Sequence, residues 1–294
     1  MADTRARRRR PLTRLQVRRT EWLTPHMIRV VAGGPGFATF IANEYSDRYV
    51  KLVFRKPDVD YPEPLDLGRI REELPRESWP TTRTYTVRWF DEAAQELAID
   101  FVYHGEVGIA GPWAAGLRPG DEVLLSGPGG AYAPSPEVDW HLLVGDESAL
   151  PAIGAALDAI PAGVPVRAFI EIGDVGDQQQ LPSPGNAEIS WLRRSGPEDD
   201  ILVRTVAELE FLPGEVQAFV HGEAGAVRSL RRHLVADRGV AKERLSLSGY
   251  WRRGKDEDGW QAEKRDIAIA ERAAAERETA QQDAAQQDAA AAAG

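Results

Sequence analysis

The sequence predicts two domains in tandem, a six-stranded antiparallel β-barrel followed by a doubly wound parallel-sheet α/β domain. The chain has 294 residues, more than one hydrophobic core usually organises. Residues 12–135 contain short β-rich segments separated by Gly, Pro and Asp, whereas residues 136–254 alternate strand-like and helix-like segments. We therefore divide the chain into an arm (1–11), a barrel domain (12–135), an α/β domain (136–254) and a tail (255–294).

The barrel is predicted from six short segments of β-favouring residues with turn residues between them. They are Leu12–Thr20, His26–Ala32, Tyr49–Arg55, Thr82–Phe90, Leu97–Tyr103 and Glu122–Ser126. Closing such strands into a barrel leaves no exposed sheet edge. Residues 56–80, between the third and fourth strands, are rich in proline and charge, and we expect them to form a surface loop.

The α/β domain is predicted from strands and helices that alternate after the P-S-P of residues 134–136. The expected strands are His141–Val144, Val166–Ile172, Glu188–Leu192, Val216–His221 and Leu245–Gly249. The G-D-E-S-A-L-P-A-I of residues 145–153 is expected to turn into a helix with Pro151 in its first turn, and further helices are expected near Leu202–Glu210 and near Ala226–Asp237. No G-x-G-x-x-G follows the first strand, which argues against a tight dinucleotide site.

Composition and charge exclude several classes of protein. The chain has no cysteine, which excludes disulfides, thiolate catalysis and cysteine-ligated zinc or iron–sulfur sites. Its five histidines form no H-E-x-x-H pair, so redox chemistry would have to come from a bound organic cofactor. A net charge of −10 disfavours nucleic acid as a partner. We find no apolar run long enough to cross a bilayer and no secretory signal, so we expect a cytoplasmic protein with no membrane partner.

The two ends of the chain differ from the body. Arg7–Arg10 form a basic cluster that we interpret as a solvated flexible arm, the alternative being a contact with an anionic partner. The tail is acidic and rich in Ala and Gln, with Q-Q-D-A-A repeated at Gln281 and Gln286. Residues 260–280 have high helix propensity, and we expect a helix that docks near its start and then frays into disorder.

The strand Thr82–Phe90 carries the first chemical signal. Alternation places Arg83 and Tyr85 on one face and Thr84 and Thr86 on the other. A tyrosine can stack on an aromatic plane, and a guanidinium can form charge-assisted hydrogen bonds with a phosphate. The pair therefore suits a ligand that has both groups.

A glycine-rich turn after the next strand carries the second signal. Residues 104–111 read H-G-E-V-G-I-A-G, and Pro112 followed by Trp113 is typical of the first turn of a short helix. Backbone N–H groups at such a helix start, in a loop with few bulky side chains, form an anion site. The turn would hold a pyrophosphate beside the ring held by the strand.

These residues resemble known signatures. Arg83-Thr84-Tyr85-Thr86 resembles the flavin motif Arg-x-Tyr-Ser/Thr of the ferredoxin–NADP reductase superfamily. Together with D-F-V-Y-H-G, G-I-A-G-P-W-A, S-G-P-G-G-A-Y, G-D-E-S-A-L-P-A-I and G-Y-W-R-R-G, the region 12–254 resembles the siderophore-interacting protein family of FAD-containing ferric-siderophore reductases. One departure is that Ile109 and Gly111 stand where the family turn usually has proline and serine, which removes one hydroxyl contact to phosphate.

The resemblance implies a set of cofactor-binding residues. For FAD they are Arg83, Thr84, Tyr85, Thr86, Asp100, Val102, His104, Gly105, Ala110, Gly111, Trp113 and Tyr132, and for the nicotinamide nucleotide they are Asp146, Glu147 and Ser148. Some have simpler interpretations. His104 could be a surface residue, Trp113 could fill the core, Tyr132 could pack at the domain junction, and residues 145–148 could only close a βα turn.

The implied chemistry is electron transfer, with no catalytic proton-transfer residue. Electrons would pass from NADH, NADPH or reduced ferredoxin through FAD to iron(III) in a siderophore, and iron(II) would be released. Glu171, at the end of the second α/β strand, can bind a ribose hydroxyl and repel a 2′-phosphate, whereas Arg193 and Arg194 could bind that phosphate. The two signals conflict, and we expect NADH while leaving NADPH open.

A positive patch beside the flavin is expected to attract an anionic ferric chelate, because a chain of net charge −10 repels it on average. Lys51 falls where resembling family members carry a lysine in the siderophore pocket, and Arg252 of G-Y-W-R-R-G would complete the patch. We expect a monomer. Two alternatives remain: a flavin reductase with another electron acceptor, and a non-enzymatic siderophore-binding protein.

Overall fold

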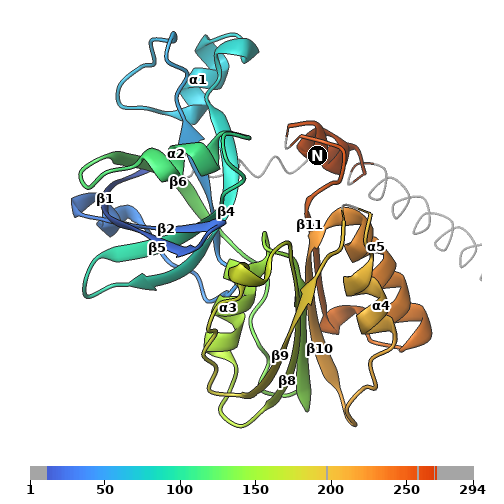
Figure 1. Ribbon diagram of the computed structural model, residues 1–294. Coiled ribbons are helices and arrows are strands. Elements are labelled where there is room, and N and C mark those ends of the chain that lie inside the picture. The colour runs from blue at the N-terminus through green and yellow to red at the C-terminus, as the bar shows by residue number, and fades with distance from the viewer. Residues whose placement is uncertain (1–11, 197, 257, 268, 270–294) are drawn as a thin grey trace, which may run out of the picture.

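A computed structural model describes residues 12–196, 198–256, 258–267 and 269. The chain forms a β-barrel and an α/β unit that lie side by side, with the end of the described chain beside both (Figure 1). The predicted basic arm and most of the predicted acidic tail lie outside the described residues.

The first unit is the predicted barrel. Its strands are β1 (Leu12–Thr24), β2 (Met27–Gly33), β3 (Tyr49–Phe54), β4 (Thr81–Asp91), β5 (Glu96–Val102) and β6 (Glu122–Gly129). They close in the order β1-β2-β5-β4-β3-β6, with every pair antiparallel. Alternate residues point inward and form one apolar core, which includes Leu52, Val87 and Phe101. The prediction of a six-stranded barrel is confirmed.

The prediction of a plain surface loop for residues 56–80 is wrong. This segment contains helix α1 (Leu67–Glu73), whose N-terminus is capped because the Asp66 carboxylate accepts hydrogen bonds from the N–H groups of Gly68 and Arg69. Ile70 anchors the helix in a small separate core on the outside of the barrel. One buried residue per two turns gives little periodic signal, which is why the sequence did not reveal this helix.

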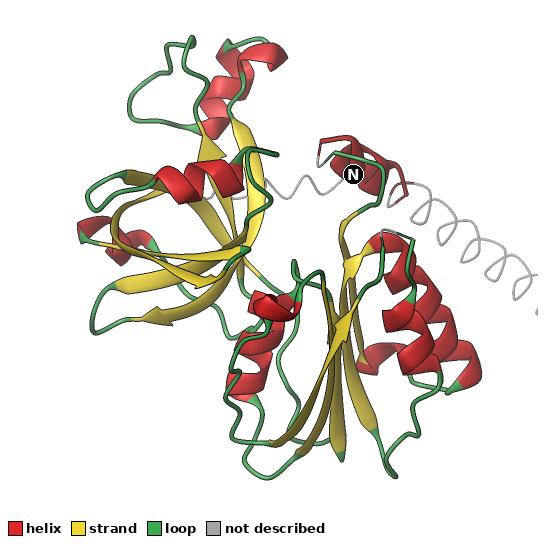
Figure 2. Cartoon of the chain, viewed as in Figure 1, coloured by secondary structure: helices red, strands yellow, loops and turns green. Residues whose placement is uncertain are grey.

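The second unit is the predicted doubly wound α/β fold. Its strands are β7 (Trp140–Gly145), β8 (Pro165–Ile172), β9 (Asn186–Arg193), β10 (Val216–Glu223) and β11 (Leu245–Trp251), in the parallel order β11-β10-β7-β8-β9. Helix α3 (Leu150–Ala159) covers the face toward the barrel, and α4 (Ile201–Ala207) and α5 (Ala224–Arg232) cover the other face (Figures 1 and 2). Helix α5 continues as a π-turn over His233–Asp237.

The two units share a packed junction. Met27 and Val102 from the barrel belong to the same apolar cluster as α3. Arg88 of β4 forms an ion pair with Asp158 of α3, and the Arg88 side chain is largely buried. On the same outer face of the barrel, Arg29 holds Asp100 with two hydrogen bonds of 2.7 Å. Hydrophobic and ionic contacts together thus join the two units.

A helix of residues 258–267 follows β11. Trp260 in its first turn is 4% exposed, and its indole N–H lies 3.4 Å from the carbonyl oxygen of Gly249. The expected docking of the tail helix near its start is confirmed. A further short helix, α2 (Ala110–Gly116), closes the barrel beside β5.

The Arg29–Asp100 pair yields a stability prediction. Arg29→Ala leaves a carboxylate that is 2% exposed without its bidentate partner, and breaking such a pair should lower the free energy of unfolding by about 3 kcal/mol. Arg19→Ala, which removes an exposed partner of Glu96 in β5, should change it by less than about 0.5 kcal/mol. Urea unfolding of both variants measures the difference, and equal effects would contradict a buried structural role for Asp100.

Candidate functional site

The Arg83 and Tyr85 side chains lie on the inner face of β4, as the alternation predicted. Arg83 pairs with Leu52 and Tyr85 with Val50 of β3, both barrel-core residues. The half-buried Tyr85 ring packs on Phe101, with ring centroids 4.5 Å apart. The Arg83 side chain is 10% exposed. A cation and an aromatic ring therefore converge at this end of the barrel.

The outer face of β4 points toward solvent and the α/β unit. Thr84 is exposed, and its hydroxyl lies 3.3 Å from the Lys51 ammonium. Thr86 is buried and hydrogen-bonds the Tyr250 hydroxyl of β11. Tyr250 in turn lies 3.0 Å from Nδ1 of the buried His221, whose pKa is lowered by burial to about 3. His221 is therefore neutral at ordinary pH.

Tyr250 and His221 were not among the predicted site residues. The available signal was the G-Y-W-R-R-G motif, in which only Arg252 was assigned a role. The structure adds the tyrosine, which connects Thr86 to the α/β unit.

The loop between β5 and α2 is the predicted glycine-rich turn. His104 is exposed, and Gly105 and Gly108 have φ of +64° and +84°, conformations that L side chains rarely adopt. Gly111 lies where a Cβ would be 3.0 Å from the Val102 carbonyl oxygen, so glycine permits the close approach of α2 to β5. The glycines thus set the path of the turn near the end of the barrel, where the side chains of Val107 and Ile109 are exposed.

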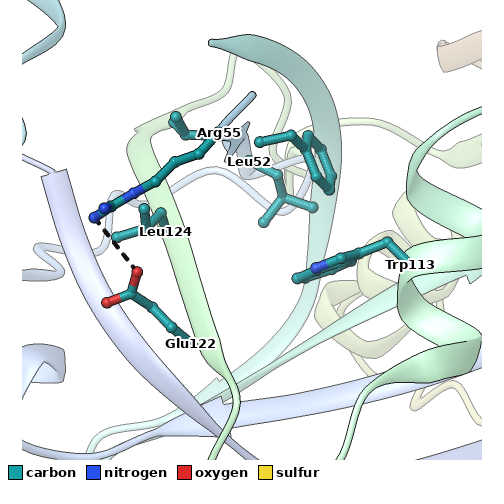
Figure 3. Close-up of a pocket in the computed structure, with 7 residues that line it drawn as sticks. Leu52, Arg55, Trp113, Glu122 and Leu124 are labelled. Carbon is teal, nitrogen blue, oxygen red and sulfur yellow. Dashed lines mark ion pairs between the residues drawn. The ribbon is translucent and has the colours of Figure 1, made fainter. Parts of the chain in front are cut away.

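Trp113 of α2 forms one wall of a cavity of about 200 Å³ (Figure 3). Its ring packs edge-on against Phe54 and Phe101, with centroids 5.2 and 5.7 Å apart. Leu52, Leu124 and the Arg55–Glu122 ion pair form other walls. Because Phe101 contacts both Trp113 and Tyr85, the cavity wall and the predicted ring-stacking residue belong to one aromatic cluster.

Two residues predicted to bind cofactor have partners within the protein. Both carboxylate oxygens of Asp100 are engaged by Arg29. Tyr132 is 2% exposed and packs against Phe219 of β10, with ring centroids 4.9 Å apart. Tyr132 therefore packs at the domain junction, and its contact with the cofactor stays a prediction.

The turn after β7 is organised by the buried Asp146 carboxylate. One oxygen accepts hydrogen bonds from the backbone N–H and hydroxyl of Ser148, at 2.9 and 2.5 Å. The other accepts from the Glu223 N–H and the Trp251 indole N–H, at 2.8 and 2.7 Å. Asp146 thus ties the carboxyl ends of β7, β10 and β11 together. Burial nevertheless raises the pKa of this carboxyl.

A second cavity of about 280 Å³ lies at these strand ends. This is the switch point of the sheet, where ligands bind in open α/β folds. The walls include five carboxylates and one arginine: Asp146, Glu171, Asp199, Asp200, Glu223 and Arg253. The cavity has a negative lining, which disfavours the binding of a ligand that carries an additional phosphate group.

Arg194, one of two arginines predicted to bind a 2′-phosphate, is held by two glutamates. Its guanidinium lies 2.7 Å from Glu147 and 3.6 Å from Glu171. Glu147 also accepts a 2.5 Å hydrogen bond from the Gly173 N–H. Glu171 and Arg194, which gave conflicting predictions from the sequence, thus belong to one ion-pair network in the structure. Arg194 is paired with glutamates in this network.

Lys51 and Arg252, the predicted chelate-binding cations, have different surroundings. Lys51 is exposed on β3. The pKa of Lys264 in the C-terminal helix is lowered by the burial of Lys264 itself and then by the nearby charge of Lys51. Arg252 lies 3.0 Å from Glu263. The structure therefore places Lys264, which the sequence analysis did not identify, beside Lys51.

Residues 16–132 match the family model described as siderophore-interacting FAD-binding domain, and residues 138–254 match the model described as siderophore-interacting protein. The chain belongs to the siderophore-interacting protein family. Among the part of the chain that the structure describes, no helix is long and apolar enough to cross a membrane.

Three relatives illustrate the similarity. An uncharacterized protein of Mycobacterium tuberculosis is 48% identical over 89% of this chain and 98% of its own length. Ferric vibriobactin reductase ViuB of Vibrio cholerae is 35% identical, over 65% of this chain and 72% of its own. The crystal structure of a siderophore utilization protein from T. fusca has a TM-score of 0.72 at 35% identity, covering 85% of this chain and 95% of that one.

Glu171 yields a pH prediction. Burial, and then the nearby Asp146, raise the pKa of its carboxyl from 4.5 to about 7, so the folded chain holds this proton more tightly than the unfolded chain. Stability is therefore lost as pH rises from about 4.5 to about 7. Glu171→Gln removes that loss, so the unfolding free energy of the variant relative to wild type should increase over this range.

Urea unfolding at a series of pH values measures this difference. Glu188→Gln, at an exposed position of the neighbouring strand β9, is the matched control and should show no such increase. A Glu171→Gln difference that stays flat over the range would show that Glu171 titrates normally.

Proposed function

We propose that this protein is an FAD-dependent ferric-siderophore reductase of the cytoplasm, which takes electrons from NADH or NADPH and delivers them to siderophore-bound iron(III). The observation that carries the proposal is the convergence of Arg83 and Tyr85 beside the α2 turn, within the region matched by an FAD-binding family model. The product would be iron(II), which a hard-oxygen chelator holds weakly.

The side chains and backbone groups at this site fit non-covalent FAD. The Arg83 guanidinium would supply charge-assisted hydrogen bonds for a phosphate, and the backbone N–H groups at the start of α2, which have no side-chain cap, would supply further donors. Tyr85 supplies an aromatic face, and the buried Thr86 hydroxyl supplies a polar contact for a ring edge. Ile109 and Gly111 lack the hydroxyl that the family turn usually carries, so Arg83 has a larger share of phosphate binding here.

Bound FAD supplies the capacity to accept a hydride and to release electrons singly. The work of the chain is to position groups. Tyr85 is fixed by Phe101, and Thr86 is fixed by Tyr250 and through it by His221. Because His221 is buried and neutral, it orients Tyr250 without adding a positive charge behind Thr86. Lys51, on the exposed face of β3, would hold the anionic chelate.

The absorption spectrum of the purified protein tests the proposal directly. A flavin spectrum should bleach under anaerobic NADH or NADPH and recover on addition of a ferric catecholate, with iron(II) captured by a ferrous-specific chelator. Reduced ferredoxin serves as the alternative donor. A colourless protein that binds ferric siderophore, and in which added FAD is not reduced by either nucleotide, would overturn the proposed reductase activity. The protein would then be a siderophore-binding protein.

The exposed Lys51 gives a prediction about the chelate. Lys51→Ala should lower kcat/KM for an anionic ferric catecholate by about three- to tenfold at low salt and less at high salt, because ions screen the lost attraction. FAD content should not change. Lys242→Ala, an exposed position on the α/β unit, removes the same charge elsewhere and should have little effect. Equal losses in both variants would show that net charge, not a local patch with Lys264, governs encounter.

The Arg194 network gives a prediction about the donor. With Arg194 held by Glu147 and Glu171, NADH should reduce the flavin faster than NADPH. The double variant Glu147→Gln, Glu171→Gln releases Arg194 and removes two negative charges, so the NADH/NADPH ratio of kcat/KM should fall by about tenfold. Stopped-flow flavin reduction measures it, with Glu188→Gln as control. A wild-type protein reduced faster by NADPH would contradict the prediction.

A further inference from the structure

The C-terminal helix (residues 258–267) lies beyond both regions that match the family models, which end at residues 132 and 254. It is anchored on the α/β unit. A Cβ on Gly249 would lie 2.9 Å from the Trp260 ring, and the Lys264 ammonium donates a 2.9 Å hydrogen bond to the Gly249 carbonyl oxygen. Glu263 forms ion pairs with Arg252 and Lys255, at 3.0 and 2.7 Å. These contacts fix the position of the first helical turn.

From that position Asp258 reaches the barrel. Its two carboxylate oxygens lie 3.0 and 3.3 Å from the two terminal nitrogens of Arg83, although the residues are 175 positions apart in the chain. The geometry is two-pronged, with one N–H donor for each oxygen. The Arg83 side chain is 10% exposed, whereas the Asp258 side chain is 76% exposed.

This arrangement places a carboxylate on the guanidinium edge that a phosphate would use. Carboxylate and phosphate oxygens accept the same forked pair of N–H donors, and two anions on one edge also repel each other. Because Asp258 is mostly in water, it can leave Arg83 at small cost in solvation. Arg83 is nearly buried and cannot move away as easily.

We infer that Asp258 is an internal competitor for Arg83 and thereby sets the affinity of the protein for FAD. The inference rests on the proposed role of Arg83 in binding an FAD phosphate. Cofactor binding would replace the Asp258–Arg83 pair, and the start of the C-terminal helix would lose this contact with the barrel while Trp260, Glu263 and Lys264 keep their contacts with the α/β side.

The coupling is reciprocal. If the carboxylate weakens FAD binding by a given factor, bound FAD weakens the Asp258–Arg83 contact by the same factor. An exposed two-pronged pair of this kind corresponds to about a three- to tenfold change in affinity. Saturating FAD should therefore speed amide hydrogen exchange in residues 258–267, which is a readout independent of enzyme activity.

The experiment is a titration of the cofactor-free full chain with FAD, followed by flavin fluorescence, on four variants. Asp258→Asn should bind FAD about three- to tenfold more tightly than wild type. Asp266→Asn, an exposed aspartate of the same helix, removes the same charge and should leave the affinity unchanged. Arg83→Ala should bind more weakly, and Asp258→Asn in the Arg83→Ala background should have no further effect, because competition acts through Arg83.

Each other outcome overturns the inference in a distinguishable way. Weaker FAD binding by Asp258→Asn would show that Asp258 holds Arg83 in a binding-ready position. Unchanged binding, or equal tightening by Asp266→Asn, would show that the pair does not compete. An Arg83→Ala protein with wild-type FAD affinity would overturn the premise, and with it the phosphate role given to Arg83 under the proposed function.

Discussion

The pleat of strand β4 is the constraint on which the rest of the structure depends. Its inward residues join the barrel interior, where Tyr85 packs on Phe101 and Arg83 lies nearly buried. Its outward residues join the other unit, where Thr86 contacts Tyr250 and Arg88 pairs with Asp158. A shift of one residue in register would exchange the two sets, exposing the aromatic ring and burying threonines in its place. One strand therefore fixes both the candidate cofactor site and the docking of the α/β unit against it.

Much of the fold was predictable because its signals are local. Period-two alternation and turn residues identified every strand of the barrel, and the change to alternating strands and helices identified the sheet that follows. Local signals also placed Arg83 and Tyr85 on one face. They failed for residues 56–80, where Ile70 meets Val53 and Leu124 from distant strands in a core too small to leave a periodic pattern.

The parts of the site that could not be predicted are contacts between distant segments. Asp146 looked like a cofactor residue because it follows the first α/β strand, but its partners, Glu223 and Trp251, are known only once the strand order places β7, β10 and β11 together. Arg29 and Asp100 are paired by barrel closure, and Arg83 meets Asp258 across 175 positions. No pattern within a window of the sequence encodes such pairings, since each depends on the tertiary arrangement.

A common feature of both units is a protein carboxylate on donors that could serve a ligand anion. Asp146 is 3% exposed and accepts hydrogen bonds from four donors, two of Ser148 in the turn after β7 and one each from β10 and β11, so displacing it would leave these donors without acceptors. Asp146 therefore has a structural role in this turn, beside a cavity lining that is already negative. Asp258 has the opposite character, because it is mostly exposed and shares one guanidinium. The difference in burial thus distinguishes Asp146, which holds the strand ends together, from Asp258, which can exchange with a ligand.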